Sequence, residues 1–457
     1  MVTSWGEPLL VAAAPPGVEC ARGVRLAGCA AMQRVAWAGA AVLLLTATVT
    51  ATPLAPWLMR PARALVERFS GLRFGRHVPV VSMTEEEARA YLRADLAKDA
   101  AGQDLEGQSE ILFRLGFLPS RVDLHAAVLE LVSSQAAAFY DPATGVFHNI
   151  SRFGPADALG EPVVVAHELT HALQDQVRPL KPLFDARKDN DDASTALRWS
   201  TEGHATVLGN RAGNVVWPVP GPAGLAAGEG TTFAGWTPLY RRLALLATTM
   251  TTTGAAPPAF LTESLLAPYL EGSRAFWAVE AILGRRAHLL WLCHPARSTE
   301  ELVHVEKYLA GTDPPLAVPL PVPAGARPRT QLVLGEWALR WLLRQGPAAE
   351  RADEAAAGWG GDTAVLLGDG RLVWRIRMDS ADDALELAEP LAGSVPHGVS
   401  VQRMARDVIA WTGGSVDPAD LVAAAPVTPA PGEWTPSAGA CRSLPGPTPL
   451  PTGERVR

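Results

Sequence analysis

Two histidines and a glutamate stand in one short run, His167, Glu168 and His171, in the pattern H-E-x-x-H. On an α-helix, residues four positions apart project from the same face, so both imidazoles point to one side. Two imidazoles placed in this way can bind a single zinc ion (Zn2+) through their ring nitrogens. Glu168 lies one step round the helix, from where its carboxylate can reach a water activated by the metal and act as a general base.

The five-residue pattern also arises by chance, as an amphipathic helix with two histidines and a glutamate on a half-wet face. The flanking residues argue against that alternative. Val163–Ala166 and Ala172–Leu173 are uncharged, so the helix expected over about 161–176 is predicted to be buried. Burying a charge without a partner costs several kcal/mol, and one divalent cation satisfies all three polar side chains together. The flanks therefore favour a zinc site.

A third zinc ligand is expected on the next helix, predicted over 192–211. A catalytic zinc takes three protein ligands and leaves one position open, and Glu202 is the candidate. The alternative is an exposed ion pair with Arg198, four residues earlier, worth a few tenths of a kcal/mol. Gly203 favours the metal interpretation, because glycine is costly inside a helix and a close approach of two helices would explain it. His204 is a second, lower-ranked candidate ligand.

Three further polar residues are candidates for supporting roles. His304 and Tyr308 could donate hydrogen bonds to the oxyanion of a tetrahedral intermediate, or could form an ordinary packed and hydrogen-bonded cluster. Asp175, one turn beyond His171, could orient an imidazole or could be a solvated helix residue. These alternatives stay open on the sequence alone.

The metal motif and its spacing resemble the gluzincin class of zinc metallopeptidases, which has the thermolysin-type ligand arrangement. The chain is more closely similar to an uncharacterised bacterial H-E-x-x-H zinc metallopeptidase family, in which His204 is usually Asp and Val305 usually Pro. This resemblance implies zinc hydrolase chemistry on a zincin-like fold and no established substrate. The stretches that carry it are 138–142, 166–176, 202–206, 298–308 and 358–362.

Composition limits the remaining possibilities. The 457 residues are 48% hydrophobic and 19% charged, which supports a packed core and excludes wholesale disorder. A net charge of -7 gives no indication of nucleic-acid binding. There is no C-x-x-C pair, so a thiolate metal site is not expected, whereas Cys293 and Cys441 could form a disulfide in an oxidising compartment.

The N-terminal region indicates export. Residues 1–31 are rich in Ala, Gly and Pro and are interpreted as a disordered or upstream extension. Arg34 then precedes an apolar run, Val35–Val49, with a small-residue exit, so 32–57 is predicted to be a signal peptide. The alternative is an uncleaved anchor over 35–57, which would associate the protein with a membrane. The expected location is the cell envelope or the extracellular space.

The predicted fold class is α+β. A mainly helical, zincin-like metal-binding domain is expected over 58–330, with a β-hairpin over 138–150 just before the metal helix and a polar loop over 177–192. A smaller α+β module is expected over 331–422, and a Pro-rich disordered tail over 423–457. The predicted elements of the module are helices over 331–346 and 379–391, a turn over 359–362, and strands over 363–367, 371–378, 399–404 and 407–411.

The function expected from these residues is that of a zinc-dependent metalloendopeptidase, acting on a peptide or protein with Glu168 as the base. Two alternatives remain. One is a zinc hydrolase on a non-peptide substrate, and the other is a zinc-containing envelope protein that binds or supports without turnover.

Overall fold

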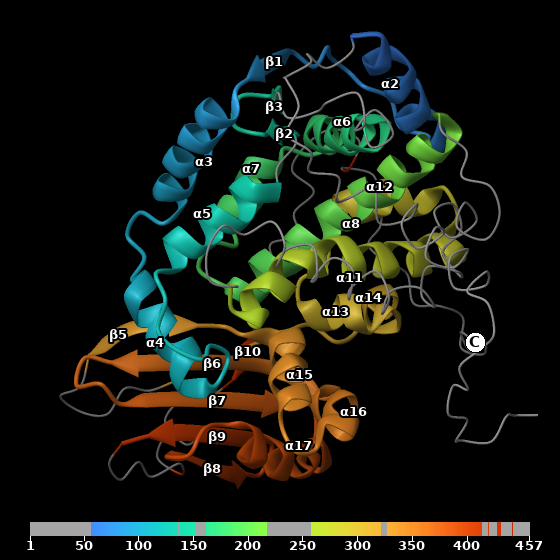
Figure 1. Cartoon of the computed structure of the whole chain (residues 1–457). Coiled ribbons are helices and arrows are strands. Elements are labelled where there is room, and N and C mark those ends of the chain that lie inside the picture. The colour runs from blue at the N-terminus through green and yellow to red at the C-terminus, as the bar shows by residue number, and fades with distance from the viewer. Residues whose placement is uncertain are drawn as a thin grey trace, which may run out of the picture. The chain divides into compact units, whose positions relative to one another are not determined.

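The computed structural model describes residues 56–135, 138–150, 161–216, 257–320, 327–413, 419, 427–430 and 441. Within these ranges the chain is a mixed α+β protein, as predicted (Figure 1). The predicted extension 1–31, almost all of the predicted signal peptide or anchor over 32–57, and most of the predicted tail 423–457 lie outside the described residues.

The first part of the described chain contains helix α2 and a three-stranded sheet. The predicted hairpin is confirmed, as the antiparallel pair β2 (Ala138–Asp141) and β3 (Val146–Ile150). The sequence analysis did not predict β1 (Val80–Met83), which pairs in parallel with β3. The other elements in this part of the sequence are helices: α2 (Pro56–Ser70), α3 (Glu85–Asp99), α4 (Leu105–Leu115) and α5 (Leu124–Gln135).

Three longer helices form the middle of the molecule and lie side by side in Figure 1. They are α6 (Glu161–Val177), α8 (Asp191–Val216) and α11 (Ala259–Leu283), and α8 packs against both of the others. The predicted close approach at Gly203 is confirmed. A Cβ atom there would lie 2.1 Å from the backbone carbonyl carbon of Gly272 in α11, so only glycine fits without moving a helix.

One face of α6 is apolar and packs in the hydrophobic core. Val165, Ala166, Leu169, Ala172 and Leu173 are all at most 1% exposed. They belong to one hydrophobic cluster with side chains of α2, β2, β3 and the second half of α8. Helix α6 is therefore buried on one face, as its uncharged flanks predicted.

The C-terminal part is a five-stranded antiparallel sheet with the strand order β5-β6-β7-β9-β8. The predicted turn over 359–362 is wrong, because these residues form the first half of β6 and pair with β7. The first strand, β5, was not predicted. Helix α17 packs on β7, β8 and β9. The elements are β5 (Pro328–Leu332), α15 (Gly335–Gln345), η2 (Ala349–Arg351), α16 (Ala352–Ala356), β6 (Trp359–Leu367), β7 (Leu372–Met378), α17 (Ala381–Ser394), β8 (Val399–Met404) and β9 (Asp407–Thr412).

Two buried aspartates hold together elements that are distant in the sequence. Asp362 in β6 accepts hydrogen bonds from the backbone N–H of Gly335 and from the indole of Trp374. At the start of α8, Asp192 accepts from the hydroxyl and backbone N–H of Thr299. Burial raises the pKa of Asp192 to about 7, although the hydrogen bonds from Thr299 oppose the rise.

A disulfide joins Cys293, at the end of a short helix, to Cys441, as the sequence allowed. The predicted polar loop over 177–192 is only partly a loop, because it contains a helix whose first N–H, that of Leu180, is bound by the carboxylate of Asp175. The remaining short elements are α7 (Leu180–Asp185), α12 (Arg286–Cys293), α13 (Thr299–Val303), α14 (Val305–Ala310), β4 (Leu316–Ala317) and β10 (Thr428–Pro429).

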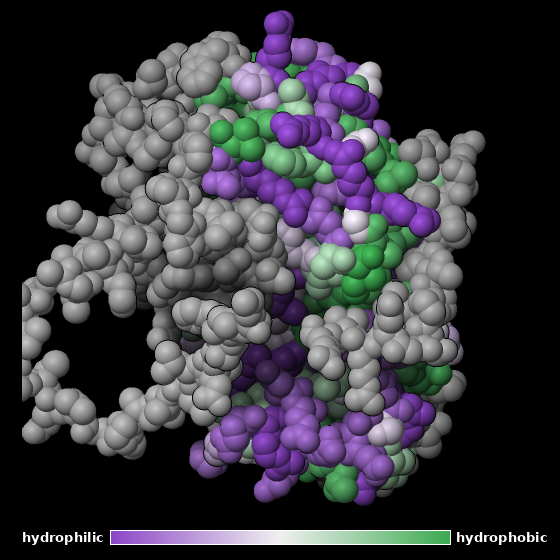
Figure 2. All heavy atoms as spheres, turned by 90° about the vertical axis from the view of Figure 1, so that its right-hand side faces the viewer, coloured by the Kyte–Doolittle hydropathy of each residue, from purple (hydrophilic) through white to green (hydrophobic). Residues whose placement is uncertain are grey.

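The described surface shown in Figure 2 is a mixture of hydrophilic residues and smaller hydrophobic patches. None of the helices that the structure describes combines the length and the apolar character needed to cross a bilayer.

Candidate metal centre

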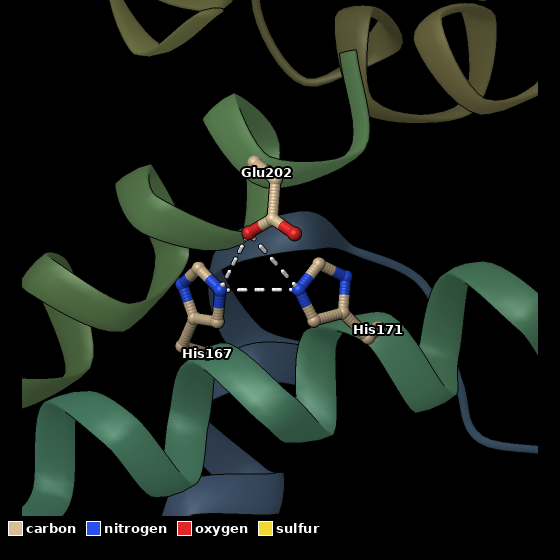
Figure 3. A group of neighbouring side chains, drawn as sticks. All are labelled: His167, His171 and Glu202. Carbon is tan, nitrogen blue, oxygen red and sulfur yellow. Dashed lines mark hydrogen bonds and ion pairs between the residues drawn. The ribbon is translucent and has the colours of Figure 1, made fainter. Parts of the chain in front are cut away.

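The side chains of His167, His171 and Glu202 converge on one point (Figure 3). Both imidazoles project from α6, and the carboxylate reaches them from α8. The Nε2 atoms of the histidines are 3.0 Å apart. Oε2 of Glu202 lies 3.1 Å from Nε2 of His167 and 3.4 Å from Nε2 of His171. The structure thus brings together all three residues that the sequence nominated as ligands.

The spacing of these three atoms suits a zinc ion. The circle through them has a radius of about 1.8 Å, shorter than the zinc–nitrogen and zinc–oxygen bonds of about 2.0–2.2 Å. One ion can therefore lie within bonding distance of all three atoms. Two imidazoles and one carboxylate are also a donor set that zinc prefers. The side chains are 12–20% exposed, so the site is nearly but not fully closed to solvent.

The packing of α8 against α6 fixes the separation of the ligands. A Cβ atom at Gly209 would lie 2.9 Å from the carbonyl oxygen of Val163 and 3.2 Å from Cβ of His167. The two helices therefore touch at the turn that carries the first ligand. Glu202 is seven residues, about two turns, before Gly209, so its side chain projects from nearly the same face of α8.

The three ligand atoms attract positive charge. Burial opposes ionisation of Glu202, but the facing imidazoles of His171 and His167 hold its pKa well below the ordinary value. Burial lowers and the Glu202 carboxylate raises the pKa of His171, with a net rise to about 9. A cation among these side chains would balance the charge of the Glu202 carboxylate, and either a proton or a divalent metal ion can supply it.

Glu168 is only 8% exposed and is held beside the ligands by the hairpin. Its Oε2 accepts a hydrogen bond of 2.8 Å from the backbone N–H of Tyr140 in β2. Burial is the main cause that raises the pKa of this carboxyl group. The predicted hairpin therefore anchors the predicted base, a contact between segments that are 28 residues apart.

Tyr269 is a site residue that the sequence analysis missed. Its ring lies 6.0 Å from the ring of His167, centroid to centroid, from a position on α11. Its hydroxyl is hydrogen-bonded to Glu202, and the charge of that carboxylate is the main cause that raises the pKa of Tyr269 above its ordinary value. The side chain is 36% exposed, so it can also meet a ligand that enters from solvent. No motif around Tyr269 distinguished it from the other aromatic residues of a helix.

His304 and Tyr308, the predicted oxyanion donors, do not join this group. Nε2 of His304 is 2.9 Å from a carboxylate oxygen of Glu336. The buried Tyr308 donates its hydroxyl proton to the carbonyl of His294 at 2.7 Å, and its ring packs on an indole. Both residues therefore have partners that match the packed-cluster alternative.

The other two candidates are also engaged elsewhere. Asp175 accepts from the hydroxyl of Tyr140 at 2.9 Å and from Arg76 at 3.2 Å, instead of orienting an imidazole. His204 is fully buried and is not one of the three converging side chains, because Gln174 and His288 lie on its two ring nitrogens.

A second group of acidic side chains, Glu300, Asp313 and Asp379, also comes close together. The ammonium group of Lys307 lies among them, at 2.5 to 3.0 Å from an oxygen of each. The cation in this cluster is the lysine itself, so the cluster explains the packing of α14 and does not indicate a metal site.

Comparison with known proteins gives one match. Residues 325–417, which include all five strands of the C-terminal sheet, match a domain of unknown function (DUF8575). No curated protein and no solved structure matches the chain. The match lies outside the helices that carry the candidate metal centre.

Proposed function

We propose that the protein is a zinc-dependent hydrolase, most simply a metallopeptidase with a zincin-like helical domain. The observation that carries the proposal is the convergence of three ligand atoms at 3.0 to 3.4 Å from two helices, beside a buried glutamate. Peptides are the favoured substrate class because the H-E-x-x-H run with Glu202 resembles the gluzincin arrangement.

The roles of the residues follow from their positions. His167, His171 and Glu202 would hold the ion. Bound zinc supplies Lewis acidity, which polarises a carbonyl group and lowers the pKa of water towards about 7. Glu168 accepts the proton of the attacking water and passes it to the leaving amine. The Tyr140 N–H holds one oxygen of Glu168 in place during this transfer.

Tyr269 replaces His304 and Tyr308 as the candidate oxyanion donor. Its hydroxyl lies beside Glu202 on a residue that is partly exposed, so in this proposal it donates to the oxygen on which negative charge develops. A group of this kind stabilises the transition state more than the substrate, and it therefore acts on kcat.

We also propose that the protein works outside the reducing cytosol. Two features support this: the disulfide between Cys293 and Cys441, and the predicted export signal over 32–57.

The decisive experiment measures metal content and turnover in the same preparations of the full chain. Wild type should contain about one zinc per chain and hydrolyse unstructured casein. Glu168→Gln should keep the zinc and lose at least about 100-fold in turnover, since it removes the base and no ligand. Glu110→Gln is the matched control, because Glu110 is also 8% exposed but is ion-paired with Arg114 in α4.

The outcomes separate the alternatives. Zinc without hydrolysis of casein or of small ester substrates in wild type would support a binding or structural protein. Hydrolysis of esters alone would move the proposal to a non-peptide substrate. A wild-type protein that binds no zinc contradicts the proposal altogether.

A further inference from the structure

A continuous series of hydrogen bonds leaves the candidate metal centre through buried side chains. Nδ1 of His171 lies 2.9 Å from Oε1 of Gln174. Nε2 of Gln174 lies 3.0 Å from Nδ1 of His204. Nε2 of His204 is 2.9 Å from Nδ1 of His288, whose Nε2 is 3.0 Å from a carboxylate oxygen of Glu280. Gln174, His204 and His288 are each 0% exposed.

The far end of this series determines the direction of every hydrogen bond. An ionised carboxylate only accepts, so Nε2 of His288 carries a proton, and in the neutral ring its Nδ1 then accepts. His204 therefore donates from Nε2 and accepts at Nδ1. The amide –NH2 of Gln174 then donates to His204, which leaves Oε1 to accept from Nδ1 of His171.

A second constraint gives the same answer from the middle of the series. Nε2 of Gln174 also lies 2.9 Å from the backbone carbonyl of Thr201, which can only accept. The amide nitrogen must face α8, and the amide oxygen must face His171. Two independent acceptors, one a carboxylate and one a carbonyl, thus agree on the orientation of Gln174.

The end of the series is firmly ionised. Arg211 binds both oxygens of Glu280, at 2.7 and 2.6 Å. Burial opposes ionisation, but the hydrogen bonds from His288 and Arg211 lower the pKa of Glu280 to about 2. The ring of Phe276 packs edge-on against both His204 and His288, with centroids 4.7 and 5.1 Å apart, and so restricts the planes of the two imidazoles.

We propose that Gln174, His204, His288 and Glu280 are positioning residues that hold His171 with its proton on Nδ1 and its Nε2 lone pair directed at the zinc ion. The inference rests on the proposed function, because it assigns these residues to the affinity of the same site. A hydrogen bond to the outer nitrogen of a metal-bound histidine fixes its ring and increases its basicity. Here that hydrogen bond is itself fixed by a series that crosses from α6 through α8 to α11 and α12.

The test is the zinc affinity of the metal-free full chain, measured by competition with a chromophoric chelator. Gln174→Leu removes the acceptor for His171, and its zinc affinity should fall about 10- to 100-fold. Gln174→Glu restores an acceptor at the same place, and it should recover most of that loss although it no longer donates to Thr201 or to His204. If Gln174 had only a packing role, restoring the acceptor in Gln174→Glu would not restore zinc affinity relative to Gln174→Leu.

Glu280→Gln tests the remote end without altering the helix that carries the histidines. It should also lower the zinc affinity, but by a smaller factor than Gln174→Leu does. Ser273→Ala is the control, because Ser273 is a buried polar residue of the same helix whose hydroxyl bonds to the carbonyl of Tyr269 and not to the series. Its zinc affinity should equal that of wild type.

The result that overturns the inference is a wild type that binds zinc while Gln174→Leu and Glu280→Gln bind it equally tightly. If Gln174→Leu does not fold, unchanged affinity in Glu280→Gln alone overturns it. Failure of the proposed function has a different signature, since wild type itself would then bind no zinc or bind zinc without turnover.

Discussion

Replacing Gly203 with alanine would place a methyl group against the backbone of a neighbouring helix. The new Cβ atom would lie 2.1 Å from the carbonyl carbon and 2.4 Å from the carbonyl oxygen of Gly272, whereas ordinary contacts begin at 3.4 Å. The obstacle is main chain, which has no rotamer to change. Helices α8 and α11 must therefore move apart by about 1 Å at this point.

The energetic effect combines two opposing terms. Alanine in place of glycine stabilises a helix interior by about 1 kcal/mol. Overpacking of a tight contact costs about 1–3 kcal/mol, and an overlap with main chain belongs at the upper end of that range. We expect Gly203→Ala to lower the free energy of unfolding by about 2 kcal/mol.

The same displacement should weaken zinc binding, because Glu202 is the adjacent residue. Ligand positions in a zinc site tolerate shifts of about 0.2 Å, which is well below the expected movement of α8. We expect the zinc affinity of Gly203→Ala to fall at least about tenfold. Urea unfolding of the metal-free chain measures the first effect, and chelator competition measures the second.

Gly393→Ala provides the matched control for this prediction. Gly393 is an exposed residue of α17, and a Cβ atom there meets only the ring of Pro347, at 3.0 and 3.4 Å. It should be at least as stable as wild type, because the helix gains an alanine, and should keep the wild-type zinc affinity. If Gly203→Ala proved as stable as wild type and bound zinc equally well, the reasoning about the α8–α11 contact would be refuted.

Two further predictions concern other side chains. Asp192→Asn should reduce the loss of stability as pH rises. Burial raises the folded-state pKa of Asp192 to about 7, so between about pH 4 and 7 the native chain binds one more proton than the unfolded chain, and its stability falls by about 1.4 kcal/mol per pH unit. Urea unfolding at pH 5 and pH 7.5 measures this slope, and an equal slope in both proteins would contradict the assignment. Tyr269→Phe should lower kcat about 100-fold and have little effect on KM. A change confined to KM would instead make Tyr269 a substrate contact.

Local signals predicted the parts of the fold and the site that depend on neighbouring residues. The spacing of His167 and His171 places both on one face of a helix, and the structure has them there. The position of Gly203 predicted a close helix contact, which the structure confirms. In each case the deciding interaction lies within one or two helical turns.

Contacts between distant segments were beyond this kind of inference. His288 follows His204 by 84 positions, and only the packing of α12 against α8 makes them neighbours. Tyr269 likewise reaches the site because α11 packs on α8. His304 has the right chemistry for an oxyanion donor, but its position is set by Glu336, which lies on a helix of the next module.

The predicted turn over 359–362 failed for a related reason. Gly360 and Gly361 indicated a turn, but both lie in strand β6, where a glycine allows strand β4 to approach closely. A Cβ atom at Gly361 would lie 2.4 Å from the carbonyl oxygen of Leu316 in β4. The glycine serves a close approach that no local pattern reveals.

The disulfide between Cys293 and Cys441 closes a ring of chain across 148 positions, and the whole five-stranded sheet lies inside that ring. A single cut in any loop of the sheet would therefore open the ring without releasing a fragment. The severed strand ends would remain tethered at high effective concentration, ready to pair again. If the proposed peptidase activity is correct, such a ring would let the fold persist after the protein cuts its own chain in one of these loops.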